Sequence, residues 1–69
     1  WEQVVNTGGQ GAYLRYSPNL EDKMVLLPEG TRLLVFDEDK EVRKTTWKHV
    51  RDEQGREGWI PAYFLGPFR

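Results

Sequence analysis

Side chains that could act as nucleophiles or bases are few and scattered in this sequence. There is one histidine, His49, one serine, Ser17, and no cysteine. Ser17 stands beside a proline in a turn-forming stretch with no base near it, so the parts of a nucleophilic triad are barely present. The carboxylates crowd into polar loops, where a solvated role is far commoner than a raised pKa. We therefore expect a protein that is not an enzyme.

Metal and phosphate sites also lack their required spacing. Residues 37–45 carry four carboxylates but neither the glycine nor the terminal glutamate of a calcium-binding loop. One histidine with scattered acids does not supply the three or four ligands of a metal site. The glycines of residues 8–11 precede no Lys-Ser/Thr pair and no helix-forming segment, so they do not make a P-loop. We expect no metal and no cofactor.

Aromatic side chains offer the remaining chemistry, which is recognition. Trp, Tyr and Phe make up 13% of the 69 residues, and a core this small has room for only a few rings, so some rings lie at the surface. The candidate ligand-binding residues are Tyr13, Tyr16, Trp47, Trp59, Pro61 and Phe64. A structural alternative is that the two tryptophans close the ends of a barrel.

The segment from Thr46 to Leu65 positions most of these side chains. Its two β-patterned runs, 46–51 and 56–61, flank the tetrad 52–55, whose glycine can supply the positive φ of a tight connection, so we expect a hairpin. Alternation along the two runs places Val50 and Ile60 in a core and keeps both tryptophans near a surface.

Pro61 belongs at the end of the second run because it cannot donate to a ladder, and residues 62–65 then have room for one helical turn. Elsewhere the apolar pattern predicts strands at 1–5, 12–16 (with Leu14 in the core), 23–27 and 31–37, a turn-rich excursion at 17–22, a charged loop at 37–45 and a tail at 66–69. Apolar residues never follow helical spacing for more than about a turn. The chain is predicted to be all-β, a small, partly open barrel of five to six short antiparallel strands with a short 3-10 turn near the C-terminus.

Bulk properties limit the partners. Ten basic and eleven acidic residues leave a net charge of −1, without the positive field that nucleic acid or an anionic membrane usually requires. No run approaches the ~18 apolar residues of a membrane span. The chain is long enough for one domain, residues 1–69. It begins at Trp1 rather than Met, so we expect it to be excised from a larger protein.

The ordered motifs resemble those of the bacterial Src-homology-3-like domains. The matching residues are Gly11, Ala12, Leu14, Arg15, Pro18, Leu27, Pro28, Gly30, Thr31, Trp47, Val50, Gly58, Trp59 and Leu65. The resemblance covers residues 4–65 and implies a Src-homology-3-like barrel. It also implies a non-catalytic targeting module of a larger bacterial cell-surface or secreted protein, located at the cell surface or outside the cell. Such a module binds cell-wall peptide, glycan or another protein through the aromatic face.

A more distant resemblance is to the eukaryotic Src-homology-3 domains, where residues at the positions of Trp47, Pro61 and Phe64 line a groove for proline-rich peptides. Phe64 lacks the hydroxyl that would bond a ligand carbonyl, and Lys48 stands where a second tryptophan is usual. An adaptor of this kind is one alternative. A structural spacer that packs Leu34 and the tail, including Phe68, on a neighbouring domain is the other.

Overall fold

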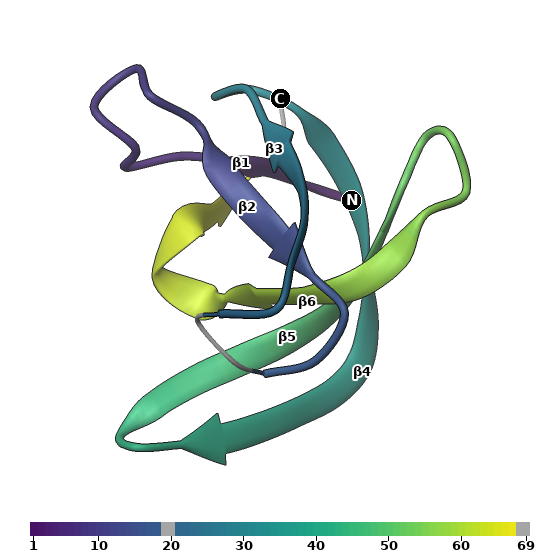
Figure 1. Ribbon diagram of the computed structural model, residues 1–69. Helices are drawn as coiled ribbons and strands as arrows, with labels where there is room; N and C mark the ends of the chain where they lie inside the picture. The colour runs from purple at the N-terminus through teal and green to yellow at the C-terminus, as the bar shows by residue number, and fades with distance from the viewer. Residues whose placement is uncertain (19–20, 68–69) are drawn as a thin grey trace.

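The computed structural model describes residues 1–18 and 21–67 and is all-β (Figure 1). Its elements are β1 (Glu2–Val4), β2 (Ala12–Arg15), β3 (Lys23–Leu27), β4 (Arg32–Val42), β5 (Thr45–Asp52), β6 (Glu57–Pro61), the 3-10 turn η1 (Ala62–Phe64) and β7 (Leu65–Pro67). Every pairing is antiparallel, in the order β3-β2-β6-β5-β4-β1-β7. The all-β prediction and the C-terminal 3-10 turn are confirmed, with seven described strands instead of five or six. Within these residues no helix is long and apolar enough to cross a membrane.

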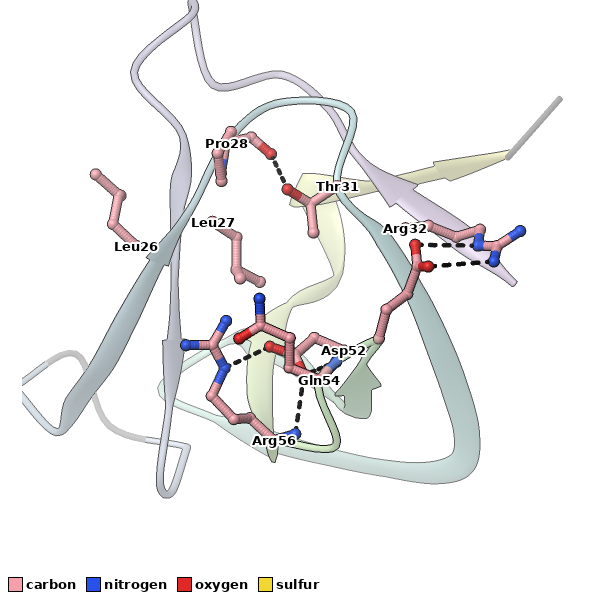
Figure 2. Close-up of a pocket in the computed structure, with 9 residues that line it drawn as sticks. Leu26, Leu27, Pro28, Thr31, Arg32, Asp52, Gln54 and Arg56 are labelled. Carbon is pink, nitrogen blue, oxygen red and sulfur yellow. Dashed lines mark hydrogen bonds and ion pairs between the residues drawn. The ribbon is translucent and has the colours of Figure 1, made fainter.

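The β5–β6 hairpin forms where the sequence predicts it. Gly55 has a φ of 88° in the connection, a backbone conformation that glycine adopts without strain. The Asp52 carboxylate accepts hydrogen bonds from the backbone N–H groups of Gln54 and Arg56, and an ion pair of 2.6 Å joins its Oδ2 to Arg56 Nε (Figure 2). The turn is therefore held by one buried carboxylate as well as by its glycine.

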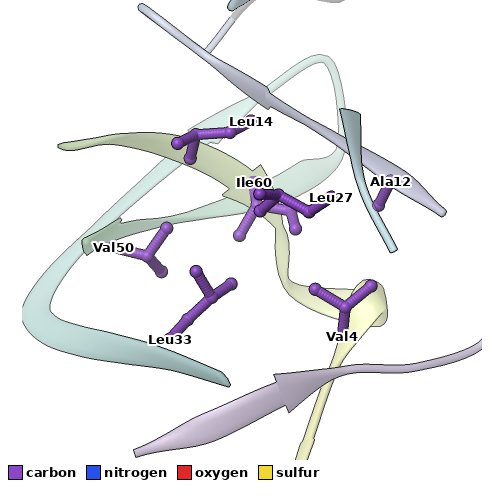
Figure 3. Close-up of a cluster of buried hydrophobic side chains, with 7 residues drawn as sticks. All are labelled: Val4, Ala12, Leu14, Leu27, Leu33, Val50 and Ile60. Atoms are coloured by element: carbon purple, nitrogen blue, oxygen red, sulfur yellow. The ribbon is translucent and has the colours of Figure 1, made fainter. Parts of the chain in front are cut away.

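The sheet curls around one cluster of buried apolar side chains (Figure 3). Its members are Val4, Ala12, Leu14, Leu27, Leu33, Val50 and Ile60. They come from six strands, so β3, at one end of the hydrogen-bonded order, and β1, next to β7 at the other end, contribute to the same core. Three of them, Leu14, Val50 and Ile60, are the core residues that alternation predicts, and all three are fully buried.

The charged segment 37–45 is not a loop, and that prediction is wrong. β4 continues through it to Val42, and a two-residue turn with positive φ at Arg43 and Lys44 leads into β5. Such a turn matches the twist of an antiparallel hairpin. This polar extension pairs with β5, and an ion pair of 2.9 Å joins Asp39 and Lys48 across the two strands. In Figure 1 the extension forms the long arm at the lower left.

The predicted excursion at 17–22 and the predicted tail at 66–69 lie only partly within the described residues. The excursion 17–22 is tied at its base, because Tyr16 N–H donates to the Asp22 carbonyl and the Ser17 hydroxyl to the Asp22 carboxylate. Asn19 and Leu20 lie outside the described residues. The predicted tail begins as β7, which pairs with β1, while Phe68 and Arg69 also lie outside the described residues.

Candidate binding face of the sheet

The outer face of the sheet carries a row of side chains that crosses five strands. The register sets Lys23 of β3 opposite Arg15 of β2, Arg15 opposite Trp59 of β6, and Trp59 opposite His49 of β5. The His49 ring stacks on Trp59 with centroids 5.0 Å apart, and Phe36 of β4 lies 4.7 Å from His49. Opposite residues share one face of a sheet, so these five side chains form a continuous band, here named the transverse row.

A second, shorter band lies beside the transverse row. Pro61 of β6 is opposite Trp47 of β5, and Trp47 is opposite Lys40 of β4. The ammonium of Lys40 reaches across to the transverse row and lies 5.2 Å from the centre of the Trp59 ring. The β4 extension that the sequence did not predict therefore brings a cation onto this face.

Arg15 is buried within the face, with 8% of its surface exposed. Its Cζ lies 5.7 Å from the centre of the Tyr13 ring and 5.6 Å from that of Trp47, within the range of cation–π attraction. Nη1 donates to the Tyr13 carbonyl, whereas the buried Nε has no hydrogen-bond partner among the described residues. Burial lowers the pKa of Arg15, with Tyr63 and Tyr13 acting in the opposite direction. A guanidinium stays charged in proteins, so this is a buried positive charge.

Gly58 allows the close approach that places Arg15 here. A Cβ at this position would collide with the Arg15 carbonyl oxygen and lie 3.1 Å from two carbons of the Leu14 side chain. Only a residue without Cβ lets β2 lie this close to β6, so Gly58 positions Arg15 next to Trp59.

The cations of this face contact rings rather than carboxylates. Lys23 Nζ lies 4.7 Å from the centre of the Tyr13 ring. Lys40 contacts the Trp59 ring, and Arg15 contacts the rings of Tyr13 and Trp47. The ion pairs formed among residues 1–18 and 21–67 involve none of these three cations. Their charges are therefore not neutralised within the described part of the chain.

Two carboxylates lie beside the His49 ring of the transverse row. Glu38 Oε1 lies 3.1 Å from His49 Nδ1, and Glu57 Oε1 lies 3.6 Å from His49 Nε2. The row thus has cations on β3 and β2, whereas carboxylates from β4 and β6 lie beside His49. A ligand with one charged group meets two different environments along it.

The predicted site residues differ in accessibility. Tyr13, Trp59 and Phe64 are partly buried, Pro61 is buried, and Tyr16 is 63% exposed. Four of them, Tyr13, Trp47, Trp59 and Pro61, come together around Arg15. Phe64 packs partly against the core and lies 4.5 Å from Tyr63, and Tyr16 makes no ring contact with any described residue.

Trp47 is only 2% exposed, so the expectation that both tryptophans lie near the surface is wrong for this residue. Its strand lies between β6 and β4, and Arg15 packs near its ring. Alternation correctly places it on the outer face, but outer side chains of a curled sheet can cover one another.

Sequence reasoning missed the cations of this face. Arg15 shares the Tyr13 face by simple alternation, and this signal could have found it. Lys23 faces Arg15 only because the register shifts after Leu14, and Lys40 lies in the segment predicted as a loop. Neither position follows from local pattern.

A separate, shallow pocket of about 260 Å³ lies beside the β5–β6 turn (Figure 2). It is lined by Leu26, Leu27, Pro28, Thr31, Arg32, Asp52, Glu53, Gln54 and Arg56. Its charged groups are paired, Arg56 with Asp52 and Arg32 with Glu53 at 3.3 Å. Burial raises the pKa of Asp52, but the hydrogen bonds from Arg56 and Gln54 together with the charge of Arg56 outweigh it and hold the pKa below the usual 3.8. The pocket contains a structural ion pair.

No group of three or more potential metal ligands occurs among the described residues. Comparisons of the chain with protein-family models, with curated proteins and with solved structures find no match. The function must therefore be argued from the geometry of the outer face.

Proposed function

We propose that this chain is a non-catalytic binding module of the bacterial Src-homology-3-like kind. It belongs to a larger cell-surface or secreted protein and recognises cell-wall fragments, peptide or glycan, on its outer face. The transverse row is the binding surface, and Trp59 is its central contact. Tyr13 and the exposed Tyr63 extend the aromatic surface on the side of Arg15.

The row of contacting rings formed by Phe36, His49 and Trp59 is the observation that carries this proposal. Three strands hold the rings in fixed positions, so little side-chain entropy is lost when a ligand binds. Flat, partly exposed rings offer large contact areas to peptides and sugars. A face needed only for packing within this domain would enclose these rings, whereas all three remain partly accessible.

The eukaryotic type of adaptor receives no support from a specific observation. Its groove requires an accessible tryptophan at the position of Trp47, and this indole is buried beside a guanidinium. The proline side chains of such a peptide also carry no anionic group for Arg15. Proline-rich peptides therefore serve as the comparison ligands in the test.

The test is a titration of the folded domain with purified muropeptides and, separately, with proline-rich peptides, followed by tryptophan fluorescence. We expect saturable binding of muropeptides that Trp59→Ala weakens by about tenfold or more, the effect of losing one central aromatic contact. Trp1→Ala is the matched control, because Trp1 lies over Arg32, away from the transverse row, and its removal should leave affinity unchanged.

Absence of muropeptide binding by the folded wild-type domain would contradict the proposal. Equal losses in Trp59→Ala and Trp1→Ala would show that the transverse row is not the site. Selective binding of the proline-rich peptides would favour the adaptor.

A further inference from the structure

The Arg15 guanidinium presents an unused edge. Nη1 is engaged by the Tyr13 carbonyl, while Nε and Nη2, which lie side by side on the other edge, donate to no described residue. Nε is enclosed by protein atoms, and Nη2 is not among the enclosed atoms. An approaching ligand can therefore reach Nη2 directly, whereas it reaches Nε only if the atoms that enclose Nε move aside.

Two adjacent donors on a planar cation match the two oxygens of a carboxylate. Arginine binds carboxylates in this bidentate manner, and a partly buried setting strengthens the interaction because water competes less. A buried donor without a partner costs free energy in the unbound protein. A ligand that accepts a hydrogen bond from this donor removes that cost, so the hydrogen bond adds to the affinity.

The surroundings favour an anion at this end of the row. Lys23 is the cross-strand neighbour of Arg15 and is exposed. Lys40 adds a third positive charge over Trp59. Two carboxylates, Glu38 of β4 and Glu57 of β6, lie beside His49, where they would repel a second anion.

We propose that the Nε and Nη2 edge of Arg15, assisted by Lys23, binds a carboxylate of the ligand while Trp59 contacts the adjoining part of the ligand. This inference rests on the proposed function and narrows it: the recognised part of the wall fragment is its peptide, since an uncharged sugar chain offers no carboxylate. The carboxylate comes from the C-terminus of the peptide or from an acidic side chain.

The first test uses the wild-type domain and sodium acetate, so it requires neither a variant nor the natural ligand. The Nε–Hε signal of Arg15 is followed by ¹H–¹⁵N NMR during titration with acetate and, at equal ionic strength, with chloride. We expect a saturable shift with acetate at concentrations where chloride produces none. Identical responses to both salts, or no response, would overturn the inference.

The second test compares variants. Arg15→Met keeps the apolar stem and should weaken muropeptide binding by about 30-fold or more, the effect of losing a buried charged contact. Lys23→Gln, at an exposed position, should weaken it about two- to threefold. Arg51→Gln, an exposed cation further along β5, is the matched control and should have no effect. If the folded Arg15→Met domain binds as tightly as wild type, the carboxylate site is excluded.

The third test identifies the source of the carboxylate and separates the two proposals. One peptide carries a free C-terminus and no acidic side chain, a second carries an amidated C-terminus and one acidic side chain, and a third has both groups amidated. Tighter binding of the first peptide identifies the C-terminus as the source of the carboxylate, and tighter binding of the second identifies an acidic side chain. Equal affinity for all three overturns the carboxylate inference and leaves the binding module intact. An acetate response without any binding of muropeptides retains the anion site and overturns the wall-binding function.

Discussion

Two arginines of this small barrel have opposite surroundings. Arg56, beside the shallow pocket, donates from Nε to the buried carboxylate of Asp52 at 2.6 Å. Arg15, on the outer face, lies between the rings of Tyr13 and Trp47 and keeps Nε without a partner. The charges of the turn pair with each other, whereas the charge of Arg15 on the outer face has no ion-pair partner among the described residues.

The hollow in the surface and the unpaired charges lie in different places on this protein. The pocket is hollow, but its charges already satisfy one another. On the outer face, by contrast, Arg15, Lys23 and Lys40 form no ion pair with a described carboxylate. Departures from full polar satisfaction are expected at functional sites more than elsewhere, so the outer face is the better place to look for binding.

The largest effect is expected when the turn is broken. Asp52→Ala removes the acceptor of two backbone N–H groups and of the Arg56 guanidinium, and should lower the free energy of unfolding by about 2–3 kcal/mol. Urea denaturation followed by tryptophan fluorescence measures this. The control is Glu53→Ala, an exposed neighbour paired with Arg32, with an expected loss below about 1 kcal/mol. Equal losses of unfolding free energy in Asp52→Ala and Glu53→Ala would show that the hydrogen bonds of Asp52 do not stabilise the turn more than an exposed ion pair does.

Replacing either arginine by methionine tests whether the two differ in their contribution to stability. Arg56→Met leaves the Asp52 carboxylate buried without its charged donor and should cost about 1–3 kcal/mol of stability. Arg15→Met should change stability by less than about 1 kcal/mol, because removal of an unpaired buried donor offsets the loss of the cation–π contacts and of the long hydrogen bond to the Tyr13 carbonyl. Denaturation of both variants under one set of conditions is the measurement. A larger loss for Arg15→Met would mean that its charge is structural.

Acid should act on the turn through Asp52. The pKa of Asp52 is lowered in the folded state from its ordinary value of 3.8. Its contribution to stability is therefore complete above about pH 3.8 and is lost as the pH falls through the folded pKa. Unfolding free energies measured from pH 7 to pH 2 should show this loss in the wild type, and Asp52→Asn should lack that part of the pH dependence. Identical pH profiles would contradict the assignment.

The smallest effect concerns a fully exposed carboxylate that is also held by hydrogen bonds. The Thr7 hydroxyl and backbone N–H both donate to Glu29 Oε1, and these bonds lower the pKa of Glu29. In Thr7→Val the pKa should rise toward the ordinary 4.5, as followed by ¹³C NMR titration of the carboxyl. Thr31→Val, whose hydroxyl donates to the Pro28 carbonyl instead, should leave that pKa in place. If the pKa of Glu29 does not change in Thr7→Val, the Thr7 hydroxyl is not what lowers it.

Much of the architecture was determined by the sequence alone. Period-two alternation identified Leu14, Val50 and Ile60 as core residues, because side chains of a strand point to opposite faces wherever the strand is placed. Turn chemistry identified the 52–55 connection through Gly55 and the end of β6 through Pro61. These are local constraints, and they hold before any tertiary contact forms.

Other features were decided only by the tertiary structure. The charged segment 37–42 became a strand because β5 pairs with it, and Trp47 became buried because neighbouring strands and Arg15 cover it. The position of Lys23 opposite Arg15 depends on a register shift after Leu14, and the approach of Arg15 to Trp59 depends on the close crossing permitted by Gly58. Whether a charge finds a partner is a matter of distance between segments far apart along the chain, which local sequence pattern does not specify.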